Sequence, residues 1–371
     1  MKQEETTENE LLLKQYYSRY GGFWVYPEML DYCYLVNPYF NRSKIIDEMQ
    51  ENFRTLVSEY PAGMGVNSRL ASECWSIKEE YIIPGNGAAE LIKVLMENLD
   101  GKVGVIRPTF EEYPNRLPDE RVITFVPQND TFRYDADFLI EFFGKNRVET
   151  IILINPDNPS GNFIAMDGIH KLAKWCEDNN IRLVLDESFV DFSVGFATNT
   201  FLNNAFLEKY PHMCVMKSIS KSYGVPGLRL GILCSADTVL IATMKKQVSI
   251  WNINSFAEFF MQIYPKYRKD YELACRQFIQ AREDFEIELK KISFIKVMPS
   301  QANYFFLEIL PPYKPKKLCA ILLEKYDILA SACLAKKGIE PNRYMRIAVR
   351  NHSDNAKFIR AMKELEFYNN K

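Results

Sequence analysis

The chain has 371 residues, of which 47% are hydrophobic and 25% are charged, and its formal net charge is −2. This length allows a large core and more than one domain. The near-neutral charge balance argues against the basic surface that binding to nucleic acid or to a membrane usually requires, so we expect neither partner.

The N-terminal residues, the cysteines and the histidines exclude several further classes of protein. Residues 1–10 are acidic and polar, unlike a secretory signal, and no stretch approaches the ~20 apolar residues that cross a bilayer. The eight cysteines include no Cys-x-x-Cys pair, which argues against a disulfide framework and against a metal site. The three histidines lie outside the motifs of serine hydrolases and zinc proteases. We therefore predict a cytoplasmic protein without a metal.

Short apolar runs alternate with helical stretches between about residues 81 and 235. The runs that predict strands are residues 102–107, 122–126, 150–155, 182–186, 213–217 and 228–234. Such alternation predicts an α/β fold with a mainly parallel sheet covered by helices on both faces. Ligands of such sheets bind at the carboxyl ends of the strands.

The pattern changes towards the C-terminus. A charged helical stretch, residues 266–291, is followed by strands and helices that predict a smaller α/β domain. We expect residues 1–45 to form an N-terminal arm and small-domain segment. Residues 46–265 would then form a large domain, and residues 266–371 a linker helix and the small C-terminal domain.

In chain order, the first candidate for a functional role is the segment PGNGAAE, residues 84–90, which follows a predicted strand and opens a helix. Gly87 and Ala88 are small, so backbone N–H groups at the start of this helix can approach a phosphate. The segment lacks the patterns that bind dinucleotides or ATP. Further along, Tyr113 could stack on a flat ring, although a single tyrosine more often belongs to the core.

Two polar residues follow the next strands. Asn158 lies in the turn-rich segment NPDNPSG, residues 155–161, and can donate to a phenolate-like oxygen. Asp186 ends the strand 182–186, where a carboxylate can hold a pyridinium nitrogen protonated. Each position alone would also fit a simple turn or a helix N-cap.

The most informative segment is SISKSYGVPGLRLG, residues 218–231. Lysine forms Schiff bases with carbonyl compounds when its environment lowers its pKa, and Lys221 stands among small hydroxyl residues. Ser218, Ser220 and Arg229 could together bind a phosphate. Alone, Lys221 would be better explained as a surface lysine, but five complementary features in this order favour a cofactor site.

In combination these motifs resemble the class I/II aminotransferase superfamily of pyridoxal 5′-phosphate (PLP) fold type I. The nearest branch is that of histidinol-phosphate aminotransferase and threonine-phosphate decarboxylase, and the resemblance covers roughly residues 21–351. It implies a large domain with a mainly parallel mixed sheet between helices, a smaller α/β domain, and PLP held by Lys221. The residues that it assigns to the cofactor are Gly87, Ala88, Tyr113, Asn158, Asp186, Phe189, Ser218, Ser220, Lys221 and Arg229.

The resemblance also implies a homodimer with shared active sites and a small amino compound as the substrate. Tyr60 looks like the tyrosine that reaches the cofactor phosphate of the neighbouring subunit. Arg346 looks like the arginine that grips the substrate carboxylate. Tyr20 and Asn303 are also expected at the substrate site.

Two departures from the aminotransferase pattern concern the reaction and the substrate. Phe189 stands where aminotransferases usually carry a tyrosine that donates to the ring oxygen, and this resembles the decarboxylase branch. Its loss should raise the pKa of the Schiff base on Lys221. The family often has an arginine near Ser331, which this chain lacks, and Lys336 or Lys337 could substitute for it.

The same residues serve transamination and decarboxylation, because the bond held perpendicular to the ring is the one that breaks. The superfamily favours transamination, whereas the local resemblance favours decarboxylation. We predict an aminotransferase acting on a small amino acid or amine, possibly bearing a phosphate or phosphonate. The alternative is an α-decarboxylase of such an amino acid, and a PLP-binding protein without catalytic activity is the third interpretation.

Overall fold

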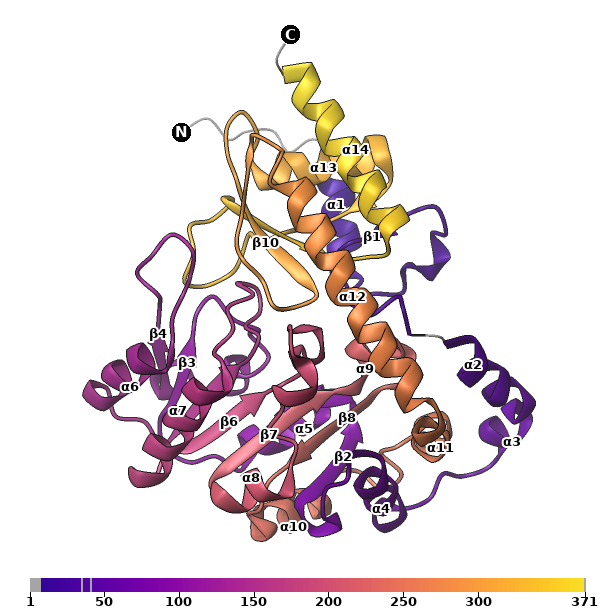
Figure 1. The fold of residues 1–371 in the computed structure, drawn as a ribbon, viewed down its shortest axis with the longest axis vertical. Helices are drawn as coiled ribbons and strands as arrows, with labels where there is room; N and C mark the ends of the chain where they lie inside the picture. Colours follow the sequence, from indigo (N-terminus) through magenta and orange to yellow (C-terminus); the bar gives the residue numbers. More distant parts are fainter. Residues whose placement is uncertain (1–7, 35, 41, 370–371) are drawn as a thin grey trace.

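The structure, a computed structural model, describes residues 8–34, 36–40 and 42–369. Its larger body is built on a seven-stranded sheet in the order β2-β8-β7-β6-β5-β3-β4, at the bottom of Figure 1. The strands are β2 (Ile82–Asn86), β3 (Val103–Ile106), β4 (Val122–Phe125), β5 (Thr150–Ile154), β6 (Arg182–Asp186), β7 (Met213–Ser218) and β8 (Leu230–Cys234). Neighbouring strands from β7 to β4 pair in parallel, and β8 is antiparallel to both of its neighbours. The predicted mainly parallel mixed sheet is therefore confirmed.

The central strands are buried along their whole length because helices cover both faces of the sheet. In β5, Ile152 and Ile154 belong to one core cluster and Ile151 and Leu153 to the other. Successive side chains of a strand point to opposite faces, so one apolar run supplies both cores. The helices of this body are α2 (Arg42–Glu51), α3 (Phe53–Ser58), α4 (Met64–Trp75), α5 (Gly87–Glu97), α6 (Ala136–Lys145), α7 (Met166–Asp178), α8 (Asn204–Lys209), α9 (Ile219–Ser222), α10 (Thr238–Gln247) and α11 (Ser255–Ile263).

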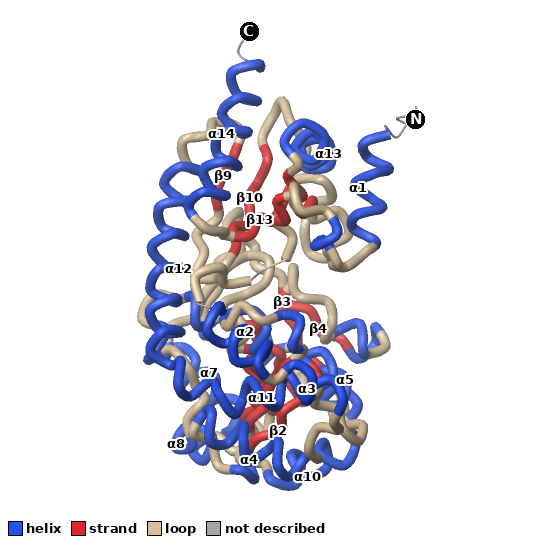
Figure 2. Tube along the Cα trace, turned by 90° about the vertical axis from the view of Figure 1, so that its right-hand side faces the viewer, coloured by secondary structure: helices blue, strands red, loops and turns tan. Residues whose placement is uncertain are grey.

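The smaller body lies above this sheet in both views (Figures 1 and 2). Its four-stranded antiparallel sheet has the order β12-β13-β10-β9. These strands are β9 (Ile295–Val297), β10 (Tyr304–Ile309), β12 (Ser331–Ala332) and β13 (Tyr344–Ala348). Its helices are α1 (Glu8–Ser18), α13 (Pro315–Tyr326) and α14 (His352–Asn369).

Two elements join distant parts of the chain. The short strand β1 (Leu30–Asp31) pairs in parallel with β11 (Ile328–Leu329), which attaches the N-terminal segment to the smaller body. The helix α12 (Arg268–Leu289) has 22 residues and runs from the larger body to the smaller one (Figure 1). We retain as a proposal the division into an N-terminal segment, a large domain and a C-terminal domain that begins with this helix.

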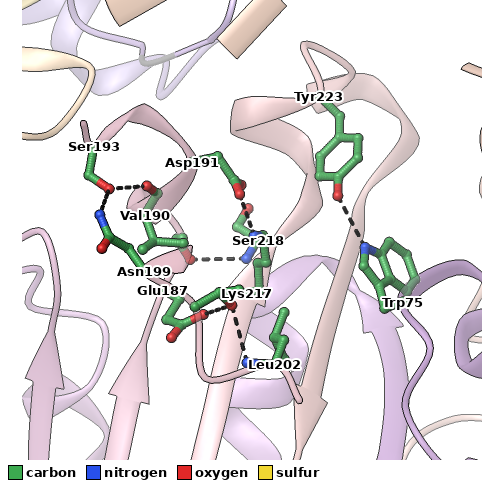
Figure 3. A network of polar contacts seen from close by, with 12 residues as sticks. Trp75, Glu187, Val190, Asp191, Ser193, Asn199, Leu202, Lys217, Ser218 and Tyr223 are labelled. Carbon is green, nitrogen blue, oxygen red and sulfur yellow. Dashed lines mark hydrogen bonds and ion pairs between the residues drawn. The ribbon is translucent and has the colours of Figure 1, made fainter. Parts of the chain in front are cut away.

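A buried ion pair joins the segment after β6 to strand β7 at the carboxyl edge of the large sheet (Figure 3). Lys217 Nζ, on β7, lies 2.7 Å from Asp191 Oδ1 in the 3-10 helix η5 (Val190–Phe192), and the two side chains are only 5% and 9% exposed. The Ser218 N–H donates to Ser188 Oγ across the same gap, at 3.0 Å. The segment after β6 is thus attached to the end of β7.

Among the described residues, no helix combines the length and apolar character that spanning a bilayer requires. The same residues contain no group of three or more histidine, cysteine or acidic side chains placed to hold a metal ion.

Substitution of Lys217 by methionine should destabilise the fold strongly, because it leaves the Asp191 carboxylate buried and unpaired. We expect the free energy of unfolding, measured in urea, to fall by about 3–5 kcal/mol. The matched control is Lys266→Met, because Lys266 forms a surface ion pair with Glu48 and is 60% exposed. That change should cost less than about 1 kcal/mol. Equal losses in the two variants would contradict a structural role of the buried pair.

Candidate active site

Two adjoining cavities open at the carboxyl ends of β5, β6 and β7. The larger one has a volume of about 980 Å³ and is lined by Asp186, Ser218, Ser220, Lys221 and Arg229 among others. The second, called here the side cavity, has a volume of about 390 Å³ and is lined by Asn158, Lys221, Ser331 and Arg346 among others. Lys221 follows β7 and borders both cavities. It thus lies between Asp186, at the end of β6, and the residues Asn158, after β5, and Arg346, on the smaller body.

Lys221 lies at the end of β7 on the short helix α9, and its amine has mostly apolar neighbours. Its Nζ is 4.1 Å from the centroid of the Phe189 ring and 5.7 Å from that of the Phe110 ring. Burial lowers the pKa of Lys221 to about 8, with Asp186 opposing the shift and Arg346 contributing to it. At a pKa of about 8, roughly a tenth of this amine is neutral, and hence nucleophilic, at pH 7, far more than for a lysine with the ordinary pKa of about 10.4.

Asp186 ends β6 and points into the larger cavity, although it is only 4% exposed. Its two carboxylate oxygens have separate donors from the protein. The Ser188 N–H donates to Oδ1 at 2.9 Å, and the Tyr113 hydroxyl donates to Oδ2 at 2.8 Å. The carboxylate is thus fixed in orientation and can still accept a further hydrogen bond from the cavity.

A group of hydrogen-bond donors at one end of the larger cavity suits an anion. The Ser220 hydroxyl is buried without a protein partner, and Arg229 borders the same space. Gly87, with φ +71°, begins α5 so close to Arg229 that a Cβ atom there would lie 2.4 Å from a guanidinium nitrogen. The start of a helix, an arginine and an unpaired hydroxyl together form a cradle that fits a phosphate group.

In the side cavity, Arg346 on β13 is held by two acceptors from other segments. Its Nη1 donates to Asn158 Oδ1 at 3.0 Å, and its Nη2 donates to the Cys33 carbonyl at 2.7 Å. Its Nε is buried without a protein partner. Ser331 pairs with Arg346 in the register of β12 and β13 and also borders this cavity. A bound anion would thus find Arg346 preorganised, with a serine beside it.

The structure places several of the predicted residues away from the cavities. Tyr113 is 1% exposed and lies behind Asp186, whereas Phe110 from the same segment borders both cavities. Asn303 is fully buried, lines neither cavity, and has both side-chain amide atoms unpaired. Tyr60 is 79% exposed and packs on Trp251, with ring centroids 4.6 Å apart, on the outer surface. Tyr113 thus supports the site from behind through Asp186, whereas the side chain of Asn303 makes no hydrogen bond to it.

The remaining predicted residues do border the site. Tyr20 lines both cavities and is 85% exposed, and Ala88 lines the larger one. Phe189 is buried and meets the Tyr304 ring edge-on, with centroids 5.1 Å apart. Aromatic residues around the side cavity that the motifs did not single out are Tyr16, Tyr17, Phe23, Tyr34 and Phe110. Phe110 could have been found in the segment RPTFEEY, residues 107–113, because it is the other aromatic residue there.

The two lysines near the missing arginine differ in their surroundings. Lys336 donates from Nζ to the Thr109 carbonyl, and burial together with the charge of Arg346 lowers its pKa. Lys337 is 55% exposed and lies 3.4 Å from Asp119 at the rim. Lys336 lines neither cavity, but it is partly buried and feels the charge of Arg346, which does line the side cavity, whereas Lys337 carries its charge in solvent.

Comparison with known proteins gives consistent results over most of the chain. The model of the family "Aminotransferase class I and II" matches residues 53–362. The L-serine phosphate decarboxylase of Sulfurospirillum multivorans is 30% identical, over 91% of this chain and 88% of that protein. A decarboxylase structure from the same organism superposes with a TM-score of 0.85 and 27% identity, covering 96% of both chains.

A second curated relative is longer. The CMP-5′-(3-aminopropyl)phosphonate synthase of Streptomyces rubellomurinus is 30% identical, over 94% of this chain and 54% of that protein. The chain thus spans about half the length of this relative.

Proposed function

The chain belongs to the family of class I and II aminotransferases, which are PLP-dependent, and on that premise we propose that it is an α-decarboxylase of a small phosphorylated amino acid or phosphonate amino acid. This proposal reverses the order of the two reactions that the sequence suggested. The similarity to an L-serine phosphate decarboxylase, over nearly the full length of both chains, is the observation that carries it. The similarity to a phosphonate synthase supports the phosphonate alternative.

The residues around the larger cavity fit PLP. The cradle of Ser220, Arg229 and the start of α5 would hold its phosphate, and Asp186 would face its ring nitrogen. Phe110, at the border of both cavities, would cover one face of the ring, the role that the sequence suggested for Tyr113. When bound, PLP supplies an electron sink for the charge that develops at Cα.

Lys221 can serve decarboxylation as well as transamination, and Phe189 favours decarboxylation. In a decarboxylation Lys221 needs only to return one proton to Cα after CO₂ leaves, and an amine with a pKa of about 8 can carry that proton. Phe189, 4.1 Å from the same amine, provides an apolar surface and no hydroxyl group. Apolar surroundings disfavour the charged carboxylate of the substrate relative to neutral CO₂, and the neutral product leaves such a site easily.

Arg346 would bind an anionic group of the substrate, because its guanidinium is already held by Asn158 and Cys33 at the wall of the side cavity. A phosphate monoester carries about −1.5 to −2 charges at pH 7, in addition to the carboxylate. One arginine balances only part of this charge. We propose that Lys336 contributes the second positive charge that the serine at position 331 cannot supply.

We also propose a homodimer. The apolar side chains Phe53, Val57, Tyr60, Ile250 and Trp251 are exposed, and Tyr60 packs on Trp251, which fits a contact between subunits. In such a dimer Tyr60 would approach the cofactor phosphate of the other subunit. A molecular mass equal to that of one chain in sedimentation equilibrium would argue against the homodimer.

We also propose that the protein is located in the cytoplasm. All eight cysteines are free thiols, which fits a reducing compartment.

The reaction is tested with the PLP-loaded protein and O-phospho-L-serine or phosphonoalanine in the absence of a keto acid. We expect release of CO₂ and of the corresponding amine, while the visible absorption of the cofactor persists over many turnovers. Lys221→Ala should release no CO₂. Conversion of the cofactor to its amine form without CO₂ would instead restore transamination as the main interpretation.

The low pKa of Lys221 predicts the pH dependence of cofactor capture by the cofactor-free protein. Only the neutral amine attacks an aldehyde, so the rate of PLP capture should rise as pH increases and level off above about 8. An ordinary lysine would level off near 10.4. The measurement is the growth of visible absorbance after mixing with PLP between pH 6 and 10. A rate that still rises tenfold between pH 9 and 10 would contradict the apolar burial of this amine.

The adjacent lysines offer a matched pair of variants for substrate recognition. We expect Lys336→Met to raise KM for the phosphorylated amino acid on the order of tenfold, because a positive charge near the bound dianion is lost. The kcat value and the KM for the unphosphorylated amino acid should change little. Lys337→Met should behave as the unmodified protein, since its charge lies in solvent beside Asp119. Equal effects of Lys336→Met on both substrates would indicate a structural role only.

A further inference from the structure

We propose that Tyr113 is a positioning residue that fixes the carboxylate of Asp186 against the ring nitrogen of PLP. This role differs from ring stacking, which the sequence suggested for Tyr113. It rests on the family's cofactor and on the geometry around Asp186, and it is independent of which reaction the protein catalyses.

The contact is direct and buried. The Tyr113 hydroxyl lies 2.8 Å from Asp186 Oδ2, and the side chains are 1% and 4% exposed. The other oxygen, Oδ1, accepts the Ser188 N–H at 2.9 Å. A carboxylate with one donor on each oxygen cannot rotate about its Cβ–Cγ bond without breaking both hydrogen bonds. Each oxygen keeps a lone pair that can face the cavity.

Tyr113 can act only as a donor in this contact. Burial, and then the negative charge of Asp186, raise the pKa of Tyr113 well above that of an ordinary tyrosine. The phenol therefore keeps its proton at neutral pH and is the donor of this hydrogen bond. Its hydrogen bond goes to a charged acceptor, and such bonds are shorter and stronger than those between neutral groups.

The phenol is itself held by the core. Tyr113 immediately precedes the 3-10 helix η3 (Pro114–Arg116), and this helix packs on α5. The ring belongs to the same apolar cluster as Val105 on β3 and Val184 on β6. Through Tyr113, the segment after β3 therefore helps to set the position of the Asp186 carboxylate. The same segment packs on α5, and α5 begins at the phosphate cradle. Both ends of the cofactor would be positioned by one packed unit.

Removal of the hydroxyl tests this role. We expect Tyr113→Phe to weaken the binding of PLP to the cofactor-free protein on the order of tenfold, the loss typical of one hydrogen bond to a buried charge. The affinity is measured by titration with PLP, so that it does not depend on substrate or turnover. The pH dependence of the visible absorption of the loaded protein should also shift, because the charge beside the ring nitrogen is less firmly held.

Tyr210→Phe is the matched control. Tyr210 is also buried, at 4% exposure, and its hydroxyl makes a 3.1 Å hydrogen bond with His170 Nδ1. This contact lies among α7, α8 and the loop before β7, and Tyr210 lines neither cavity. Its removal deletes the same atom from a comparable environment. We expect unchanged affinity for PLP and an unchanged spectrum.

A double-mutant cycle separates positioning from a general loss of stability. If Tyr113 acts through Asp186, then Asp186→Asn should weaken PLP binding more than Tyr113→Phe does. The double variant should bind PLP no more weakly than Asp186→Asn alone. Additive losses, or a Tyr113→Phe variant with the affinity of Tyr210→Phe, would overturn the proposal. A failure to release CO₂ would refute the proposed reaction and leave this result standing.

Discussion

The buried ion pair between Lys217 and Asp191 is the interaction on which the geometry of the site depends. It links the loop after β6 to the end of β7 (Figure 3). Asp186 is the last residue of β6, Phe189 lies in the loop that follows it, and β7 leads to Lys221. Parallel strands bring their carboxyl ends to one edge of a sheet, but they do not determine how the following loops lie relative to one another. The Lys217–Asp191 pair fixes this relative position, because it is almost fully excluded from water and separating its members would leave each of them buried and unpaired.

A second constraint sets the position of the smaller body. Arg282, in the middle of α12, is 2% exposed and donates to the backbone carbonyls of Phe192 and Ala302. These carbonyls belong to η5 and to the loop before β10, so one guanidinium bridges the two bodies. Burial lowers the pKa of Arg282 to about 10. Arg346 on the smaller body also donates to Asn158 on the larger body. The two contacts together hold Arg346, which is expected to bind the substrate, in a fixed position relative to the residues that are expected to bind the cofactor.

The sequence predicts those parts of the site that depend on local patterns, and it does not predict those that depend on contacts between distant parts of the chain. Lys221, Asp186 and Asn158 could be located because each follows an apolar strand, and strand ends of a parallel sheet converge. The choice between Phe110 and Tyr113 could not be made, because it depends on how the chain turns after β3 into η3 and which ring then meets α5. The pairing of β1 with β11 joins residues about 300 positions apart, and no local pattern predicts its register.

Phe189 connects the two chemical properties of the site that matter most for the reaction. A tyrosine here would offer a hydroxyl group close to the cofactor and to the lysine, whereas phenylalanine offers only a ring, 4.1 Å from Lys221 Nζ. The ring is fixed by its edge-on contact with Tyr304, whose hydroxyl donates to the Asp157 carbonyl in the loop that carries Asn158. Phenylalanine thus provides no donor here, and its ring is one of the apolar neighbours of Lys221, whose burial lowers the pKa of its amine. A single side chain therefore lies both where the family usually places a donor to the cofactor and beside the amine that would bind it, which is why position 189 bears on the choice of reaction.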